Sequence, residues 1–550
     1  MNLKSSYVKS WLEEEIKENT VAFVMQQTAA EIVEKIIADN PELKKKQRFD
    51  LEKLETVENI RCLATAEYII ADVELPTFFS KREGQTYIFI SYTKEWNANL
   101  TRLLLHADYI IEHEGSLELP KNMKTIIDGQ IVPSNNYTFI KRREQLATSK
   151  AKKNIVMYCG GFKNNGITSS ALNLMKNLNK DKYQIIVIEQ EKLPYYEALN
   201  FKKIPEHVIK IQIPGNINIA HDEEEVFLDF HCHPLEHLMK NGPTGFLTDE
   251  IKTIYQRELQ RVLGNIEIDI ALDFDGYFKY WTLLLASSNS PRKIIYQHNE
   301  MMQEYSKKLG KAYKHRSDLN IIFPLYNYFD VIVSVAKQTG EVNKQHLEHV
   351  VQDTSKMTYI HNSIDYEAIL SSAKEDNDIE IPSDTFNFVT MGRLSPEKNH
   401  KGLIKAFKQL QEKHADTQLF IIGLGELEEE LKKYTSELGL EDKVHILGQL
   451  ENPFPIINAC DAFVLSSIHE GQPMVLLECL VLEKPIVSTN IPGCYSILKD
   501  GYGLLVDKST EGLVEGMEKL LLGYDDFKKF DYKAYNKEAV KMLEEVLEGK

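Results

Sequence analysis

The strongest constraint on the fold is a repeated alternation of short apolar runs with helix-like segments. Residues 154–190 carry NIVMYCGG, then SSALNLMKNL with a helical pattern, then YQIIVIEQ. Further apolar runs stand at 268–274, 292–298 and 330–336. A strand, a helix and a second strand in this order predict a right-handed βαβ unit within a parallel sheet. Runs this apolar are typical of strands that are covered on both faces.

The alternation restarts after a polar, acidic stretch at 366–385, with strand-like runs at 387–392, 418–423, 444–448, 462–467 and 485–489. We therefore predict an α/β fold with two tandem doubly wound, Rossmann-like domains and a ligand-binding cleft at the carboxyl ends of their strands. The predicted domains are 151–370 and 371–525, followed by a C-terminal helix over 526–550. Residues 1–150 form a predicted N-terminal α/β accessory module, with strand-like runs at 66–73 and 86–92. The basic stretch 141–153 is interpreted as a linker.

Composition narrows the functional classes. A net charge of −17 argues against general nucleic-acid binding, which needs an excess of Lys and Arg. The six cysteines form no CxxC pair, which indicates a reducing compartment. No run of about 18 apolar residues and no signal-peptide pattern is present. We expect a cytoplasmic protein, with peripheral association at the inner face of the cell membrane left open.

Two cations follow the first strand of the C-terminal domain, in MGRLSPEKNHKGL at 391–403. The predicted strand ends near Gly392 and a helix begins near His400, so Arg393 and Lys398 should lie at the carboxyl end of the sheet. A helix N-terminus offers N–H groups and partial positive charge to a diphosphate. Arg393 can add a forked hydrogen-bond pair and Lys398 a point charge. The alternative is that both are solvated surface cations.

Two carboxylates follow a later strand of the same domain, in SSIHEGQPMVLLECL. Glu470 should lie in the loop after the strand, and Glu478 about one turn into a buried helix. Carboxylate oxygens suit sugar hydroxyls because each accepts more than one hydrogen bond. Alternatively, Glu470 caps the helix and Glu478 makes a structural hydrogen bond. A glycosidase pair is disfavoured, because eight residues of continuous helix would separate the two by about 12 Å.

Weaker signals lie in the first Rossmann-like domain. Gly160 and Gly161 form a glycine-rich turn in CGGFKNNGITSSA, where backbone amides can approach a phosphate or an acceptor, or simply make a tight turn. His298 follows a buried strand in YQHNEMM and can reach the cleft, although such a His is also commonly structural. Asn362 in HNSID follows another strand and can line the cleft floor.

A histidine-rich segment, HCHPLEH at 231–237 with His221 upstream, offers His231, His233 and His237 as metal ligands. Its spacing matches no zinc pattern and a proline interrupts it. We interpret it as a polar surface loop and predict no metal site.

Taken together, GRLSPEKN, EGQPMVLLE, KPIVSTNIPG and GYGLLV resemble the retaining family 4 glycosyltransferases of GT-B fold, over residues 154–525. The resemblance implies that Arg393 and Lys398 hold the donor diphosphate, that Glu478 binds the ribose and that Glu470 contacts the donor sugar. It implies that His298 faces the sugar and that the turn at Gly160 and Gly161 lies near phosphate or acceptor. The family more often has EGFG where this chain has Gly471, Gln472 and Pro473 after Glu470, so the identity of the sugar stays open.

The sequence patterns and the resemblance together assign two sets of residues. The predicted catalytic residues are His298, Arg393, Lys398 and Glu470. The predicted nucleotide-sugar contacts are Gly160, Gly161, Asn362, Arg393, Lys398, Glu470, Gly471, Gln472 and Glu478. No metal and no cofactor is implied apart from the nucleotide-sugar donor, for which a UDP-linked sugar is the first expectation.

Residues 60–92 resemble the end of the N-terminal domain of teichoic-acid-type glycerophosphotransferases, without the histidine that is catalytic there. The predicted function is transfer of a sugar to a teichoic-acid-like or capsular polymer, or to its lipid-linked precursor, with retention of configuration. Two alternatives stay open: a non-catalytic partner of a sister transferase, and a phosphotransferase that uses a CDP-alditol.

Overall fold

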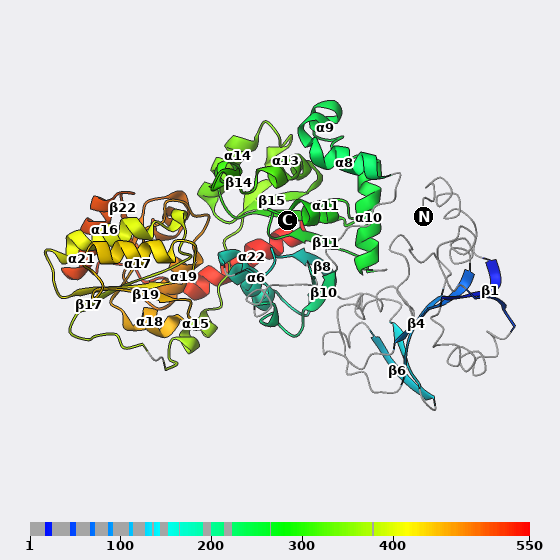
Figure 1. Ribbon diagram of the computed structural model, residues 1–550, viewed down its shortest axis with the longest axis horizontal. Coiled ribbons are helices and arrows are strands. Elements are labelled where there is room, and N and C mark those ends of the chain that lie inside the picture. Colours follow the sequence, from blue (N-terminus) through cyan, green and yellow to red (C-terminus); the bar gives the residue numbers. More distant parts are fainter. Residues whose placement is uncertain are drawn as a thin grey trace. The chain divides into compact units, whose positions relative to one another are not determined.

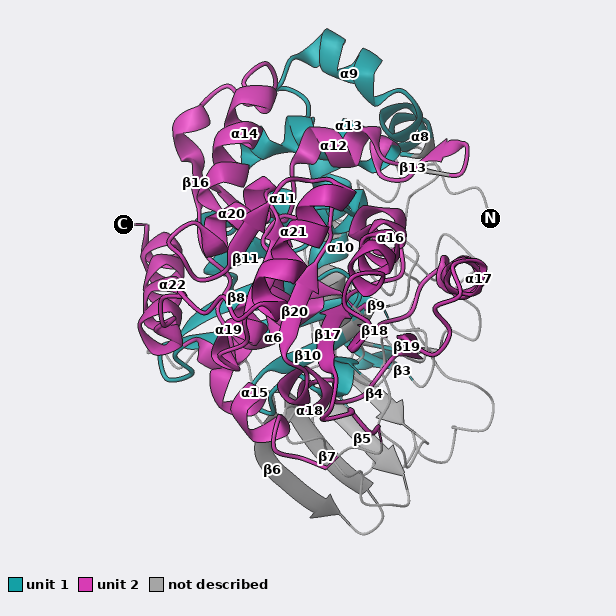
Figure 2. Ribbon diagram, turned by 90° about the vertical axis from the view of Figure 1, so that its left-hand side faces the viewer, with its two compact units in different colours: residues 1–162, 179–294, 317–330 teal, residues 163–178, 295–316, 331–550 magenta. Residues whose placement is uncertain are grey.

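The computed structural model describes residues 17–24, 45–50, 66–71, 86–91, 109–113, 127–134, 137–142, 152–163, 165–190, 200–213, 223–263, 266–376 and 379–549 (Figure 1). The chain divides into two compact units (Figure 2). Unit 1 comprises residues 1–162, 179–294 and 317–330, and unit 2 comprises residues 163–178, 295–316 and 331–550.

The first sheet belongs to the N-terminal region of unit 1 and has the strand order β2-β1-β3-β4-β5-β7-β6. The strands from β2 to β5 in this order pair in parallel, whereas β5, β7 and β6 pair antiparallel. The predicted runs at 66–73 and 86–92 are β3 and β4. The bounds of the strands are β1 (Lys17–Val24), β2 (Gln47–Asp50), β3 (Ala66–Ala71), β4 (Thr86–Ser91), β5 (Tyr109–His113), β6 (Ile127–Ser134) and β7 (Tyr137–Arg142). The predicted linker at 141–153 lies largely outside the described residues.

The second sheet has the order β10-β9-β8-β11-β12-β15-β16. Its strand order reverses between β8 and β11, which pair in parallel. Its strands are β8 (Lys153–Tyr158), β9 (Tyr183–Gln190), β10 (Ile209–Ile213), β11 (Ile270–Asp273), β12 (Arg292–Gln297), β15 (Val331–Ser334) and β16 (Met357–Tyr359). The helices of this region are α6 (Gly166–Asn177), α8 (Glu224–Cys232), α9 (Pro234–Asn241), α10 (Asp249–Leu263), α11 (Lys279–Ala286), α12 (Met301–Ser306), α13 (Arg316–Leu325) and α14 (Lys337–Leu347). A short hairpin, β13 (Lys308–Leu309) and β14 (Ala312–Tyr313), follows α12.

The third sheet lies in unit 2 and is parallel throughout, with the order β19-β18-β17-β20-β21-β22. Its strands are β17 (Phe386–Met391), β18 (Thr417–Ile422), β19 (Val444–Gly448), β20 (Ala462–Leu465), β21 (Ile486–Thr489) and β22 (Leu504–Val506). Its helices are α15 (Tyr366–Ser372), α16 (His400–Gln411), α17 (Glu428–Glu437), α18 (Phe454–Ala459), α19 (Met474–Val481), α20 (Pro492–Leu498), α21 (Thr510–Leu521) and α22 (Tyr532–Glu548). The order reverses between β17 and β20, which is the point where ligands bind in open α/β sheets.

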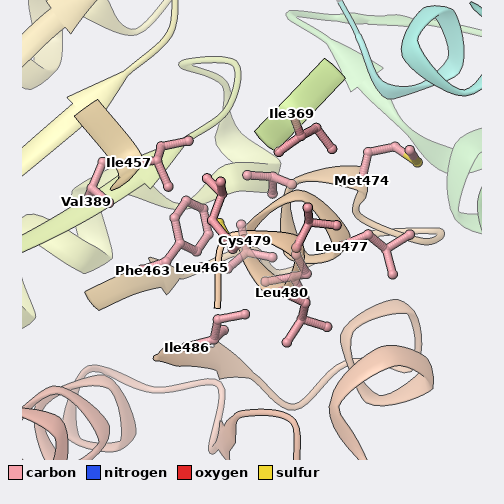
Figure 3. Close-up of a cluster of buried hydrophobic side chains, with 14 of the residues drawn as sticks. Ile369, Val389, Ile457, Phe463, Leu465, Met474, Leu477, Cys479, Leu480 and Ile486 are labelled. Atoms are coloured by element: carbon pink, nitrogen blue, oxygen red, sulfur yellow. The ribbon is translucent and has the colours of Figure 1, made fainter. Parts of the chain in front are cut away.

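Alternating side chains of the third sheet build two separate cores. Phe388 packs with residues of α16, α17 and α21, while its neighbour Val389 packs with residues of α18, α19 and α20. Successive residues of a strand point to opposite faces, so one strand contributes to both cores. Figure 3 shows the second core, where Phe463 and Leu465 of β20 meet Leu477 and Leu480 of α19. The predicted fold class of two Rossmann-like α/β domains is confirmed.

The histidine-rich segment is not a loop, and that prediction was wrong. His231 lies in α8 and His237 in α9, and His233 joins the two helices. Pro234 does not interrupt the helices because it stands in the first turn of α9, where its missing N–H costs nothing. The histidines bind separate partners: His231 Nε2 lies 3.0 Å from Tyr255 Oη, and His237 Nε2 lies 2.9 Å from Phe246 O.

Within the described ranges, no three His, Cys, Asp or Glu side chains are grouped as a metal site would need. His221 lies outside those ranges. In the same ranges, every helix is too short or too polar to cross a bilayer.

Candidate active site

The loop after β17 carries the two predicted cations. The strand ends at Met391, a single 3-10 turn spans Pro396–Lys398, and α16 begins at His400. Asn399 joins the turn to the helix in a left-handed conformation, with φ of 53°. Asparagine tolerates this region better than most residues. Arg393 and Lys398 therefore stand at the carboxyl end of β17, as predicted. The strand order of the third sheet reverses at the same strand.

Lys398 forms an ion pair with Glu470, the predicted carboxylate in the loop after the neighbouring strand β20. Its Nζ lies 2.5 Å from Glu470 Oε1, and the two side chains are only 17% and 12% exposed. Ser467 Oγ donates to the same carboxylate oxygen over 2.7 Å. The loops after β17 and β20 are also joined through the backbone, since Ile468 N–H donates to Glu397 O over 2.8 Å. Lys398 is thus not a solvated surface cation.

Glu470 does not cap the helix that follows it. The residue at the N-cap of α19 is Pro473, and no side chain caps that end. The carboxylate of Glu470 is instead turned to Lys398 and Ser467. This geometry contradicts the alternative that Glu470 caps α19. Glu470 is instead the partner of a cation, Lys398.

Glu478 lies just over one turn into α19, and every other residue of that helix is buried. Glu478 itself is partly exposed, and no side chain or backbone group in the described part of the chain hydrogen-bonds its carboxyl group. Desolvation by the surrounding protein raises the pKa of Glu478 to about 7. The structure therefore gives no support to a structural hydrogen bond and leaves a carboxyl group available to a ligand.

The raised pKa of Glu478 predicts a pH-dependent stability. Between the ordinary value of 4.5 and about 7, folded Glu478 keeps a proton that the unfolded chain has released. The free energy of unfolding should therefore fall as pH rises through this window and level off above it. Relative to Glu478→Gln, the free energy of unfolding of the wild type should fall by at most about 3 kcal/mol. The fall is smaller if water reaches the partly exposed carboxylate, because solvent screens its charge. Urea unfolding of the wild type and Glu478→Gln at pH 5 and pH 8 gives the free energy of unfolding of each protein. If the two proteins differ by the same amount at both pH values, the raised pKa of Glu478 is contradicted.

His298 follows β12 and is buried, with its ring stacked 5.8 Å from that of Tyr296. Its backbone carbonyl presses on the turn that follows Glu470. A Cβ built on Gly471 would lie 1.5 Å from His298 O, so only glycine fits there. Unit 2 thus places the backbone of His298 next to the Glu470 loop. The predicted contact of the His298 side chain with a donor sugar stays a prediction.

Gln472 and Asn362 are brought together, and the side chain of each is hydrogen-bonded within the protein. Asn362 N–H donates to Gln472 Oε1 over 2.8 Å, and Gln472 Nε2 lies 3.0 Å from His361 Nδ1. Ser170 Oγ donates to Asn362 Oδ1 over 2.5 Å. Both residues are buried. The Gln472 side chain thus holds the turn at Gly471 against the loop after β16, whereas the Asn362 side chain is bound to α6. The predicted contacts of both residues with a donor stay a prediction.

Gly160 and Gly161 belong to unit 1, where they follow β8 with φ of 81° at each. A Cβ on Gly160 would lie 2.2 Å from Asp275 Oδ1. Asp275 follows β11, so the turn stands where the strand order of the second sheet reverses. The close approach and the positive φ together explain glycine at this position, and the predicted contact with a phosphate or acceptor stays untested.

Four ionisable residues next to the predicted ones were missed by sequence reasoning: Lys307, Glu304, Glu397 and His469. Glu397 Oε1 lies 3.3 Å from Arg393 Nη2 and 3.3 Å from Lys307 Nζ. Buried Glu304 lies 3.1 Å from His469 Nε2 and 3.7 Å from Lys307 Nζ. Glu397 and His469 stand inside motifs already noted, GRLSPEKN and HEGQP. The only signal for Lys307 was the basic run KKLGKAYKHR at 307–316.

The C-terminal domain matches a known family. Residues 371–537 match the family model described as glycosyl transferases group 1. This segment contains Arg393, Lys398, Glu470 and Glu478.

Curated relatives carry related names. An uncharacterized glycosyltransferase of Methanocaldococcus jannaschii is 28% identical over 208 residues, which cover 37% of this chain and 49% of the relative. The N-acetylgalactosamine-N,N'-diacetylbacillosaminyl-diphospho-undecaprenol 4-alpha-N-acetylgalactosaminyltransferase of Campylobacter jejuni is 34% identical over 211 residues, which cover 37% and 55%. The UDP-Gal:alpha-D-GlcNAc-diphosphoundecaprenol alpha-1,3-galactosyltransferase of Escherichia coli is 30% identical over 169 residues, covering 29% and 44%. The chain spans about half the length of these relatives.

Among solved structures, Anabaena HepE, crystallised with UDP and glucose, is similar to this chain with a TM-score of 0.50 and 15% identity. The match covers 71% of this chain and 99% of HepE. At this identity the likeness concerns the fold alone, and it agrees with the two Rossmann-like domains.

Proposed function

We propose that this protein transfers a sugar from a nucleotide-sugar donor to a glycan acceptor. The observation that carries the proposal is the set of residues at the strand-order reversal of the third sheet. There Lys398 and Arg393 follow β17, and Glu470 follows β20 and pairs with Lys398. The match of residues 371–537 to the group 1 glycosyl transferases supports the same activity.

Arg393 and Lys398 are proposed to bind the donor diphosphate. As the bond between the anomeric carbon and the phosphate oxygen breaks, negative charge builds on the leaving diphosphate. Two fixed cations at that point stabilise the charge without rearranging solvent. We propose that the acceptor hydroxyl attacks from the face that the diphosphate leaves and gives its proton to a phosphate oxygen, which retains the anomeric configuration. No step requires a metal.

Glu478 and Glu470 are proposed to bind the donor's hydroxyl groups. Burial raises the pKa of Glu478 to about 7, which means that its ionised form is poorly solvated. Hydrogen bonds from two ribose hydroxyl groups would stabilise that ionised form. Glu470 is held by Lys398 beside the turn at Gly471, where it can meet the sugar. His298, whose carbonyl touches that turn, is proposed to face the sugar as well.

The acceptor is proposed to be a cell-wall or capsular polymer of teichoic-acid type, or its lipid-linked precursor. The Campylobacter jejuni and Escherichia coli relatives are named for undecaprenol-linked acceptors, which favours a lipid-linked one. Such an acceptor would bring the protein to the inner face of the membrane as a peripheral cytoplasmic protein.

Product analysis tests the proposal. Purified protein is incubated with cell-envelope extract and, separately, UDP-, GDP- and CDP-linked sugars and CDP-glycerol. Sugar transfer releases a nucleoside diphosphate, and we expect it from one nucleotide sugar. Phosphotransfer from CDP-glycerol releases CMP instead, so CMP as the only product would overturn the proposal. Release of neither would favour a non-catalytic partner.

A further inference from the structure

Lys307 and Arg393 are held by one oxygen atom although they come from distant parts of the sequence. Lys307 directly follows α12, and Arg393 follows β17. Both cationic nitrogens lie 3.3 Å from Glu397 Oε1. All three residues belong to unit 2.

The carboxylate between the two cations is firmly ionised. Burial would raise the pKa of Glu397, but Lys307, the backbone amide of Glu397 and Arg393 outweigh it and lower the pKa to about 2. Lys307 also lies 3.7 Å from Glu304 Oε1, but that carboxylate is shared with His469 at 3.1 Å. Glu397 is therefore the group that Lys307 and Arg393 have in common.

A single carboxylate oxygen faces two cations from separate elements. A non-bridging phosphate oxygen that contacts both cations would take the same position. The sugar-bearing phosphate of the donor carries one negative charge, as the carboxylate does, and it gains further negative charge as the sugar leaves. Charge-assisted contacts between such a phosphate and two cations are strong. The cations are accessible to such an exchange, because the side chains of Arg393 and Lys307 are 48% and 23% exposed. Glu397 itself is only 14% exposed.

We propose that Lys307 is a third cation of the donor site. It binds the sugar-bearing phosphate of the donor together with Arg393, and Glu397 is the internal counter-ion that this phosphate displaces. The inference rests on the proposed function, since it assigns a further residue to the same diphosphate. It assigns a role to the segment after α12, which no motif had connected with the donor.

The competing explanation is structural: Lys307 would only fix Glu397 and thereby the loop at 393–398. The two explanations differ in which phosphate they affect. A direct contact with the second phosphate strengthens binding of a nucleoside diphosphate and leaves the monophosphate unchanged. If Lys307 has only a structural role, Lys307→Ala should weaken the binding of both the nucleoside diphosphate and the monophosphate. Glu397→Gln should then weaken binding as much as Lys307→Ala does.

Calorimetric titration with UDP and UMP, and with the GDP/GMP and CDP/CMP pairs, separates these outcomes. For the base that the wild type binds, Lys307→Ala should weaken the diphosphate about tenfold and change the monophosphate less than about twofold. Lys307→Arg should retain most of the affinity. The control is Lys308→Ala, because Lys308 is the next residue along the chain and lies in β13 with its Nζ over the Tyr313 ring. This variant should match the wild type.

Equal effects of Lys307→Ala on diphosphate and monophosphate, or no effect on either, would overturn the inference. So would a loss in Glu397→Gln as large as that in Lys307→Ala. A wild-type protein that binds none of the nucleoside diphosphates would instead contradict the proposed function, so the two failures are distinguishable.

Discussion

Lys398→Ala is expected to lower the rate of sugar transfer about a hundredfold to a thousandfold, because one fixed group that stabilises transition-state charge typically contributes this much. Lys398 stands at the carboxyl end of β17 and is only 17% exposed, so little water can replace its charge. The variant also leaves Glu470 without its cation, although Ser467 Oγ still donates to it. The rate of nucleoside diphosphate release, measured at saturating donor, reports the effect.

The matched control is Lys401→Ala, at the second residue of α16. Lys401 is 54% exposed and pairs with Glu430 over 2.7 Å, away from Glu470. It should transfer sugar at the wild-type rate. Thermal melting of both variants checks that they are folded, and a folded Lys398→Ala protein with near wild-type turnover would remove Lys398 from the site.

Gly471→Ala is expected to abolish most transfer and to destabilise unit 2. The added Cβ would lie 1.5 Å from His298 O and 2.6 Å from His298 C, and both are backbone atoms that cannot turn aside. Either the end of β12 or the Glu470 loop must therefore move. Misplacing a catalytic group by about 1 Å can cost about a hundredfold in rate, and overpacking costs about 1–3 kcal/mol of stability.

Gly166→Ala provides the control for this substitution. A Cβ on Gly166 would lie 3.7 Å from Met474 Cγ, an ordinary contact, and Gly166 is the first residue of α6. We expect its melting temperature and turnover to match the wild type. If Gly471→Ala behaves in the same way, the close packing of the Glu470 loop on His298 is not needed for function.

The parallel sheets could be predicted because each buried strand leaves a short apolar run that ends at a glycine or polar residue. AFVLSS, for example, became β20, and its polar end placed Glu470 at the strand-order reversal. The helices α8 and α9 were missed because Pro234 resembles a loop signal and is equally compatible with the first turn of a helix. β10 was missed because IKIQI alternates too briefly to stand out.

The charged network around the site could not be predicted, because pairing across ninety residues depends on the fold. Lys307 and Glu397 meet only once the segment after α12 is placed beside the loop after β17. Gln472 differed from the common family pattern and was assigned to the sugar. The structure shows its amide bound to Asn362 N–H and His361, which no local pattern encodes.

The most direct test of the central claim is calorimetric titration of the wild-type protein and Glu478→Gln with UDP-, GDP- and CDP-linked sugars at pH 8. At this pH the wild-type carboxyl group, with its pKa of about 7, is mostly ionised and can accept both ribose hydroxyls. We predict that one nucleotide sugar binds the wild type and that Glu478→Gln binds it at least about tenfold more weakly. A wild type that binds none of the donors, or a Glu478→Gln protein that binds one equally well, would contradict the account.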